Sequence, residues 1–189
     1  MTAVSRVDQS AATTEISSQD QPVNELQRRM YDIYVQTLRE LTALAEQLWQ
    51  DKVAERHTLV SSIWEHHAVS IGGTRQTGKS TAIAHLSNPE DLIVVYNSHD
   101  RPRMIELLRA FHGGDHATVV TASTLRSVVS KRMTNRQGQM PLPFRNPARI
   151  YIDDSRWVFS NGLSLSMREF SRFVLAEYAA KLPTVICVG

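Results

Sequence analysis

Residues 68–86 read AVSIGGTRQTGKSTAIAHL, and this stretch carries more information about the fold than any other part of the chain. It begins with a short apolar run, Ala68–Gly72, and ends in a segment that favours a helix through Ala84. Between them lies Gly73–Thr81, in which Gly73–Ser80 matches the pattern G-x-x-x-x-G-K-[ST]. An apolar run that passes through a glycine-rich turn into a helix predicts the first unit of a parallel α/β sheet.

The residue types in this motif suit a bound phosphate chain. Glycines let the backbone curl until consecutive N–H groups face an anion, and the helix that follows adds its positive end. Lys79 would reach the β- and γ-phosphates, and the Ser80 hydroxyl would bind Mg²⁺. The alternative is a glycine-rich turn that matches by chance. The predicted nucleotide-binding residues are Gly73, Thr74, Arg75, Gln76, Thr77, Gly78, Lys79, Ser80 and Thr81.

Downstream, apolar runs alternate with helical patterns. Four further runs predict strands, at Leu92–Tyr96, Ala117–Thr121, Arg149–Ile152 and Thr184–Val188. Helices are predicted between them, at Pro102–Phe111, Ser123–Met133 and Ser164–Leu182, and a loop at 134–147. Nearly continuous apolar strands that alternate with helices indicate a parallel sheet covered on both faces. We therefore predict an α/β, three-layer sandwich with a mainly parallel five-stranded sheet.

Upstream, the chain has two different segments. Residues 1–21 are rich in Ser, Thr and Gln, which predicts a flexible tail. Residues 22–56 place apolar side chains three and four positions apart, which predicts one long amphipathic helix. This helix either packs on the flank of the domain or docks on another subunit. With 189 residues in total, the chain has room for one domain, at 57–189.

A second motif follows the Arg149–Ile152 run, which leads directly into Asp153 and Asp154. Ligands of open α/β sheets bind at the carboxyl ends of the strands, so these acids would face the glycine-rich turn. Asp153 would hold Mg²⁺ and Asp154 would polarise an attacking water. The alternative is a pair of solvated turn aspartates. The two motifs together predict an ATPase that depends on ATP and Mg²⁺.

These features, in this order, resemble the first RecA-like (ASCE) domain of helicases and translocases. The resemblance is strongest to the ATPase domain of viral large terminases, which package DNA into phage heads and often carry Arg-Gln-x-Gly-Lys-Ser/Thr where Arg75–Ser80 lies here. Some AAA-type ATPases share this loop. The resemblance covers about residues 57–189 and implies a DNA-packaging motor that works as a ring of subunits. It also implies that the Thr184–Val188 strand lies between the first strand and the acidic strand.

The resemblance implies roles for single residues. Arg75 falls where terminases place an arginine that acts in cis on the γ-phosphate, although it could simply face solvent. Asp154 departs from the family, in which Glu usually follows the magnesium aspartate. Its shorter reach implies slow hydrolysis, or a contribution from another acid such as Glu65 or Glu169. Lys79, Asp154 and Arg75 are thus the predicted catalytic residues, and Ser80 and Asp153 the predicted metal ligands.

The family continues beyond the last strand into a coupling segment, whereas this sequence stops at Gly189. We therefore expect this polypeptide alone not to form a complete motor. Three alternatives remain open: a nucleotide-binding scaffold with weak hydrolysis, the first RecA-like domain of a helicase, and a small-molecule P-loop kinase. The paired acids and the lack of an Arg-rich lid argue against the kinase.

Charge and composition exclude several classes of protein. Lys and Arg number 21 against 19 Asp and Glu, so a histone-like protein is excluded, and the single Cys187 excludes a disulfide scaffold. From His116 to Ile152 there are bases but no acid, which suggests contact with double-stranded DNA, unless the bases form a solvated face or pair with an acidic subunit. The candidates are Arg126, Lys131, Arg132, Arg136 and Arg145, followed by Arg149.

No apolar segment of the sequence approaches the length of a membrane span, and residues 1–22 lack the apolar core of a signal peptide. The sequence therefore predicts a cytoplasmic protein without membrane contact, in the host cytoplasm if the protein is viral.

Overall fold

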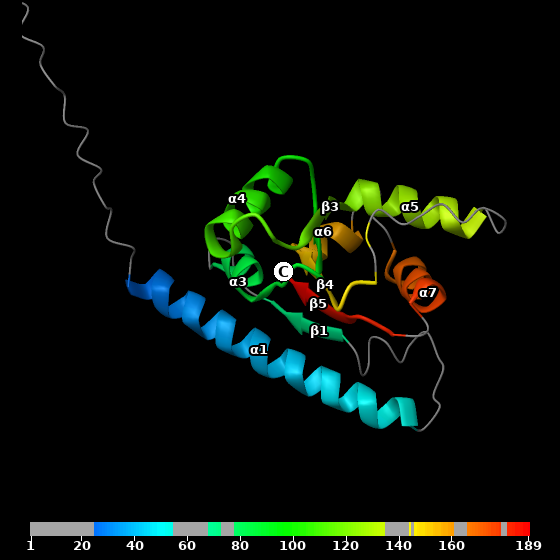
Figure 1. The fold of residues 1–189 in the computed structure, drawn as a ribbon, viewed down its shortest axis with the longest axis horizontal. Coiled ribbons are helices and arrows are strands. Elements are labelled where there is room, and N and C mark those ends of the chain that lie inside the picture. The colour runs from blue at the N-terminus through cyan, green and yellow to red at the C-terminus, as the bar shows by residue number, and fades with distance from the viewer. Residues whose placement is uncertain are drawn as a thin grey trace, which may run out of the picture.

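The computed structural model describes residues 25–54, 68–72, 78–134, 144, 146–160, 166–178 and 181–189. Within them, six helices surround one five-stranded sheet (Figure 1). The strands are β1 (Ala68–Ile71), β2 (Leu92–Val95), β3 (Thr118–Thr121), β4 (Arg149–Asp153) and β5 (Thr184–Val188). The helices are α1 (Glu25–Ala54), α3 (Lys79–Leu86), α4 (Asp100–His112), α5 (Ala122–Thr134), α6 (Ser155–Ser160) and α7 (Met167–Glu177).

All strand pairs in the sheet are parallel, and the strand order is β1-β5-β4-β2-β3. Strands β2 and β5 are buried along their whole length, as expected for strands covered on both faces. The five-stranded parallel sheet is therefore confirmed. So is the expected place of β5, which pairs with β1 on one side and β4 on the other.

The sheet separates two hydrophobic layers, because successive side chains of a strand point to opposite faces. In β2, Ile93 and Val95 pack with α1, α3 and α4, whereas Leu92 and Val94 pack with α5, α6 and α7. The three-layer α/β arrangement is thus built from strands that are apolar on both faces.

Helix α1 lies along the flank of the domain, next to α3 and the edge strand β1 (Figure 1). Its buried side chains recur at three- and four-residue intervals, with Tyr34, Leu38 and Ala45 in the core. The structure thus confirms the expected flank packing. A second row of α1 residues (Leu26, Ile33, Leu44 and Leu48) is exposed.

The segment after β4 differs from the predicted pattern. The short helix α6 was not predicted. Of the helix predicted at Ser164–Leu182, the described residues show α7. Helix α7 begins at Ser166, whose side chain accepts a hydrogen bond from the Glu169 backbone N–H in a capping box. The predicted tail, residues 1–21, lies outside the described residues. None of the helices described is long and apolar enough to cross a membrane.

Candidate functional site

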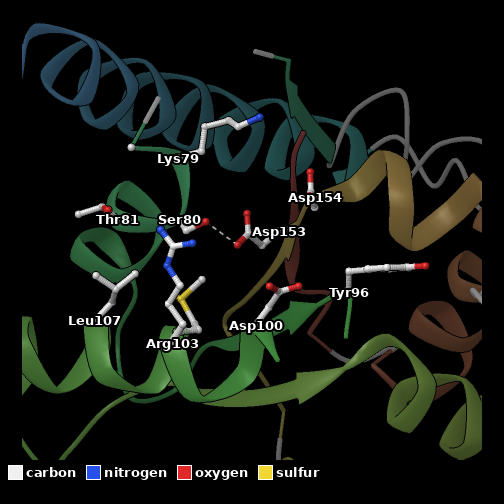
Figure 2. A pocket seen from close by; sticks show the side chains of 11 residues that line it. Lys79, Ser80, Thr81, Tyr96, Asp100, Arg103, Leu107, Asp153 and Asp154 are labelled. Carbon is white, nitrogen blue, oxygen red and sulfur yellow. Dashed lines mark hydrogen bonds between the residues drawn. The ribbon is translucent and has the colours of Figure 1, made fainter. Parts of the chain in front are cut away.

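The carboxyl ends of β4 and β2 meet the N-terminus of α3 at one edge of the sheet (Figure 2). A pocket of about 230 Å³ opens there. It is lined by Gly78, Lys79, Ser80, Thr81, Tyr96, Asp100, Arg103, Met104, Leu107, Asp153 and Asp154. The end of the glycine-rich motif and both predicted acids thus share one pocket.

Gly78 starts α3 in a conformation that favours glycine. Its φ is 79°, in the left-handed region, and its carbonyl accepts the Ala82 backbone N–H at 2.8 Å. A Cβ at this position would lie 3.3 Å from the Tyr31 Cβ of α1, so the close approach of α1 also favours a residue without a side chain. Residues 73–77 lie outside the described residues, so the role of Arg75 stays a prediction.

A hydrogen bond joins Ser80 and Asp153 in the pocket. The Ser80 hydroxyl donates a hydrogen bond of 2.7 Å to Asp153 Oδ2, although the two residues are 73 positions apart (Figure 2). Each was predicted from its own motif as a ligand of one metal ion. The sheet brings the two predicted ligands into direct contact.

Asp153 has more acidic than basic side chains among the charged neighbours that shift its pKa. Burial raises the pKa of its carboxyl and the hydrogen bond from Ser80 lowers it, while the nearby carboxylates Asp154 and Asp100 raise it again. The Lys79 ammonium lowers the pKa of Asp153 only as the weakest of these effects. A cation bound at this edge of the pocket would reduce the repulsion among the three carboxylates.

The donor set suits Mg²⁺ better than a metal held by protein alone. Among the described residues, no three His, Cys, Asp or Glu side chains converge closely enough to enclose a metal ion. Mg²⁺ usually takes one or two carboxylates and fills its remaining positions with water and phosphate oxygens. Ser80 and Asp153 could hold it in this way.

Asp154 has an unusual backbone. Its φ is 57°, which is uncommon for a residue other than glycine, and its carbonyl accepts the backbone N–H groups of Trp157 and Val158. It therefore ends β4 and starts α6 within a single residue. Residues held in such sparsely populated conformations cluster at functional sites. Asp154 lines the pocket, as predicted.

One wall of the pocket was missed by the sequence analysis. Helix α4 contributes Asp100, Arg103, Met104 and Leu107, which are spaced three and four residues apart and share a face. The Asn97 side chain accepts the backbone N–H groups of His99 and Asp100 and so caps the first turn. The helical pattern of this segment was visible in the sequence, but nothing in it marked Asp100 and Arg103 as facing the site.

The other predicted residues are spread over the molecule. Arg126 and Lys131 are exposed on α5, whereas Arg132 pairs with Glu177 at 3.5 Å. Glu169, which was predicted as a substitute acid, caps α7 and does not line the pocket. Arg149 pairs with Glu46 of α1 at 3.3 Å. The basic stretch is thus partly neutralised within the chain, and Arg136, Arg145 and Glu65 lie outside the described residues.

No protein-family model matches the sequence, and neither a curated protein nor a solved structure matches it. The chemistry of the pocket must therefore be inferred from its own residues.

Proposed function

We propose that this protein binds Mg-ATP in the pocket and hydrolyses its terminal phosphate bond. The observation that carries the proposal is the 2.7 Å hydrogen bond from Ser80 to Asp153. A hydroxyl at the start of a helix and a carboxylate at the end of a neighbouring strand are the two protein ligands expected for the Mg²⁺ of a bound nucleotide.

The roles of the residues follow from their chemistry. Mg²⁺, when bound, neutralises charge on the β- and γ-phosphates. Ser80 and Asp153 would hold the metal, and Lys79 would bind the β- and γ-phosphates. Asp154 would orient the attacking water, and Arg75 would stabilise the charge on the transferred phosphoryl group. Gly78 and Thr81 would contact the phosphate chain with backbone N–H groups at the start of α3.

We propose further that the ATPase serves a DNA-translocating machine of the terminase type. The support is the Arg75–Ser80 sequence and the exposed bases Arg126 and Lys131 on α5. Such motors work as rings, so contacts between copies of the chain belong to the proposal. A nucleotide-binding scaffold with weak hydrolysis is the competing function, because Asp154 has a shorter reach than glutamate.

Phosphate release from ATP, measured with and without double-stranded DNA, tests the proposal. The proteins compared are the wild type, Lys79→Ala and, as a matched control, Lys181→Ala, because Lys181 is exposed at the opposite end of the sheet from the pocket. We expect Mg²⁺-dependent turnover in the wild type and control, faster with DNA, and lost in Lys79→Ala. Tight binding without turnover would favour the scaffold. Phosphate transfer to a metabolite would favour a kinase.

A further inference from the structure

Helix α4 presents Asp100 and Arg103 to the pocket and is held in place by buried apolar side chains. Met104 and Leu108 are 2% and 0% exposed, and they fix the helix against the sheet. The Asn97 cap holds its first turn. Arg103 therefore projects into the pocket from a rigid element rather than from a loop.

Among the described residues, the Arg103 side chain has no bonded partner, although an acidic side chain lies nearby on the same helix. Within the described part of the chain it makes no hydrogen bond and no ion pair, although Asp100 lies one turn earlier on the same helix. Its guanidinium points toward Ser80 (Figure 2). An unpaired arginine in a pocket with Lys79 and Ser80 indicates an anionic ligand, because guanidinium matches phosphate oxygens with two parallel N–H donors.

The position of α4 indicates which phosphate group of a bound nucleotide Arg103 would contact. Helix α3 contacts α1 on one side and α4 on the other. Helix α1 also contacts β1, whereas α4 also contacts β3, which lies next to β2 in the sheet. Asp153 ends β4, which neighbours β2, so Arg103 and Asp153 lie on the same side of α3. Mg²⁺ held by Ser80 and Asp153 would neutralise charge on the β- and γ-phosphates, so the terminal phosphate would lie on this same side of α3.

We propose that Arg103 binds the terminal phosphate and makes the site distinguish nucleoside triphosphate from diphosphate. This inference rests on the proposed function and adds a residue that no sequence motif contains. Arg103 is exposed, so its replacement does not remove core packing. The expected effect is a selective loss of affinity for the triphosphate.

Calorimetric titration with a non-hydrolysable ATP analogue and with ADP, each with Mg²⁺, tests the inference. The proteins are the wild type, Arg103→Ala, Arg103→Lys and the matched control Arg109→Ala, which changes an exposed arginine in the last turn of the same helix. We expect Arg103→Ala to bind the analogue ~10- to 100-fold more weakly, with little change for ADP. Arg103→Lys should fall between, because lysine keeps the charge but not the bidentate fork.

Four results would overturn the inference, and they can be told apart. Equal affinities in the wild type and Arg103→Ala, or an equal loss for both nucleotides, would show that Arg103 does not contact the terminal phosphate, while wild-type binding keeps the proposed function intact. Failure of the wild type to bind either nucleotide would overturn the proposed function and the inference together. A loss in Arg109→Ala equal to that in Arg103→Ala would also contradict a specific role.

Discussion

Each of the two edges of the sheet holds a cluster of polar and charged side chains, and the two clusters differ in their bonding partners. At the carboxyl edge, burial raises the pKa of Asp153, and at the amino edge, burial raises the pKa of Asp91, which is only 2% exposed. Both clusters contain an arginine and further acids. The contrast lies in what these groups bond to.

At the amino edge, the polar groups bond to the protein. Asp91 Oδ2 accepts the Asn88 backbone N–H at 2.7 Å, and the Asp91 carbonyl accepts the Thr118 N–H. Arg149 pairs with Glu46 of α1. Burial also raises the pKa of the neighbouring Tyr151 to about 12. This cluster ties the starts of β2, β3 and β4 and the helix α1 together, although Asp91 Oδ1 has no hydrogen-bond partner in the part of the chain that the structure describes.

At the carboxyl edge, the charged groups surround open space. Within the described residues, the side chains of Asp100, Arg103 and Asp154 make no hydrogen bond or ion pair, and all three line the pocket with Asp153. Charges that a protein keeps near a pocket without pairing them are available to a ligand. The amino edge thus ties elements of the fold together, whereas the carboxyl edge keeps unpaired charges at a pocket, which supports the proposed binding site.

Asp153→Asn should have the largest effect, on hydrolysis. Removing the charge proposed to bind Mg²⁺ while keeping the acceptor for Ser80 should lower Mg²⁺-dependent turnover by ~100-fold or more. The matched control at the other edge is Asp91→Asn, which should leave turnover unchanged. Equal losses in the two variants, measured as initial rates of phosphate release, would remove the distinction between the edges.

Asp91→Ala should have the larger effect on stability. It leaves the Asn88 N–H without its acceptor and should lower the free energy of unfolding by about 1–3 kcal/mol. Asp153→Asn, by contrast, removes an ionised group that burial and two neighbouring acids disfavour, and should leave stability unchanged or higher. Urea denaturation without nucleotide checks both. A strongly destabilised Asp153→Asn would contradict the account.

The same raised pKa predicts a pH dependence with a definite sign. A carboxyl whose pKa is higher in the folded than in the unfolded state binds protons more readily when folded, so stability rises as pH falls through the folded pKa. Without Mg²⁺, the wild type should therefore gain stability relative to Asp153→Asn as the pH is lowered from neutral. Asp91 is present in both proteins, so its contribution to the pH dependence cancels in the comparison. Urea denaturation measures the free energy of unfolding of both proteins. A wild type that loses stability relative to Asp153→Asn as the pH is lowered would contradict the prediction.

Glu46→Gln should have the smallest effect. The pair between Glu46 and Arg149 is partly exposed, and such pairs contribute about 1 kcal/mol or less. The loss of unfolding free energy should shrink further in high salt because exposed charges are screened. A loss as large as that of Asp91→Ala, measured by urea denaturation, would mean that α1 is held mainly by this ion pair rather than by its buried apolar side chains.

The sequence predicted the parts of this molecule that depend on local pattern. Apolar runs located the five strands, and the two motifs predicted that Ser80 and Asp153 would meet. The missed parts depend on packing between distant segments. Helix α6 begins at the left-handed Asp154, which no periodicity shows. Arg103 faces the pocket because Met104 and Leu108 fix the rotation of α4, and in the sequence it is one arginine among several.

The most direct test of the central claim is thermal unfolding of the wild type with ATP, with and without Mg²⁺. A ligand at about 100 times its Kd stabilises the folded state by about 2.7 kcal/mol, which for a chain of this size raises Tm by roughly 5–10 °C. We predict this rise with Mg²⁺ and ATP together, and little rise with ATP alone or in Asp153→Asn. The same Tm in the wild type with and without Mg-ATP would contradict the claim that the carboxyl edge is a nucleotide site.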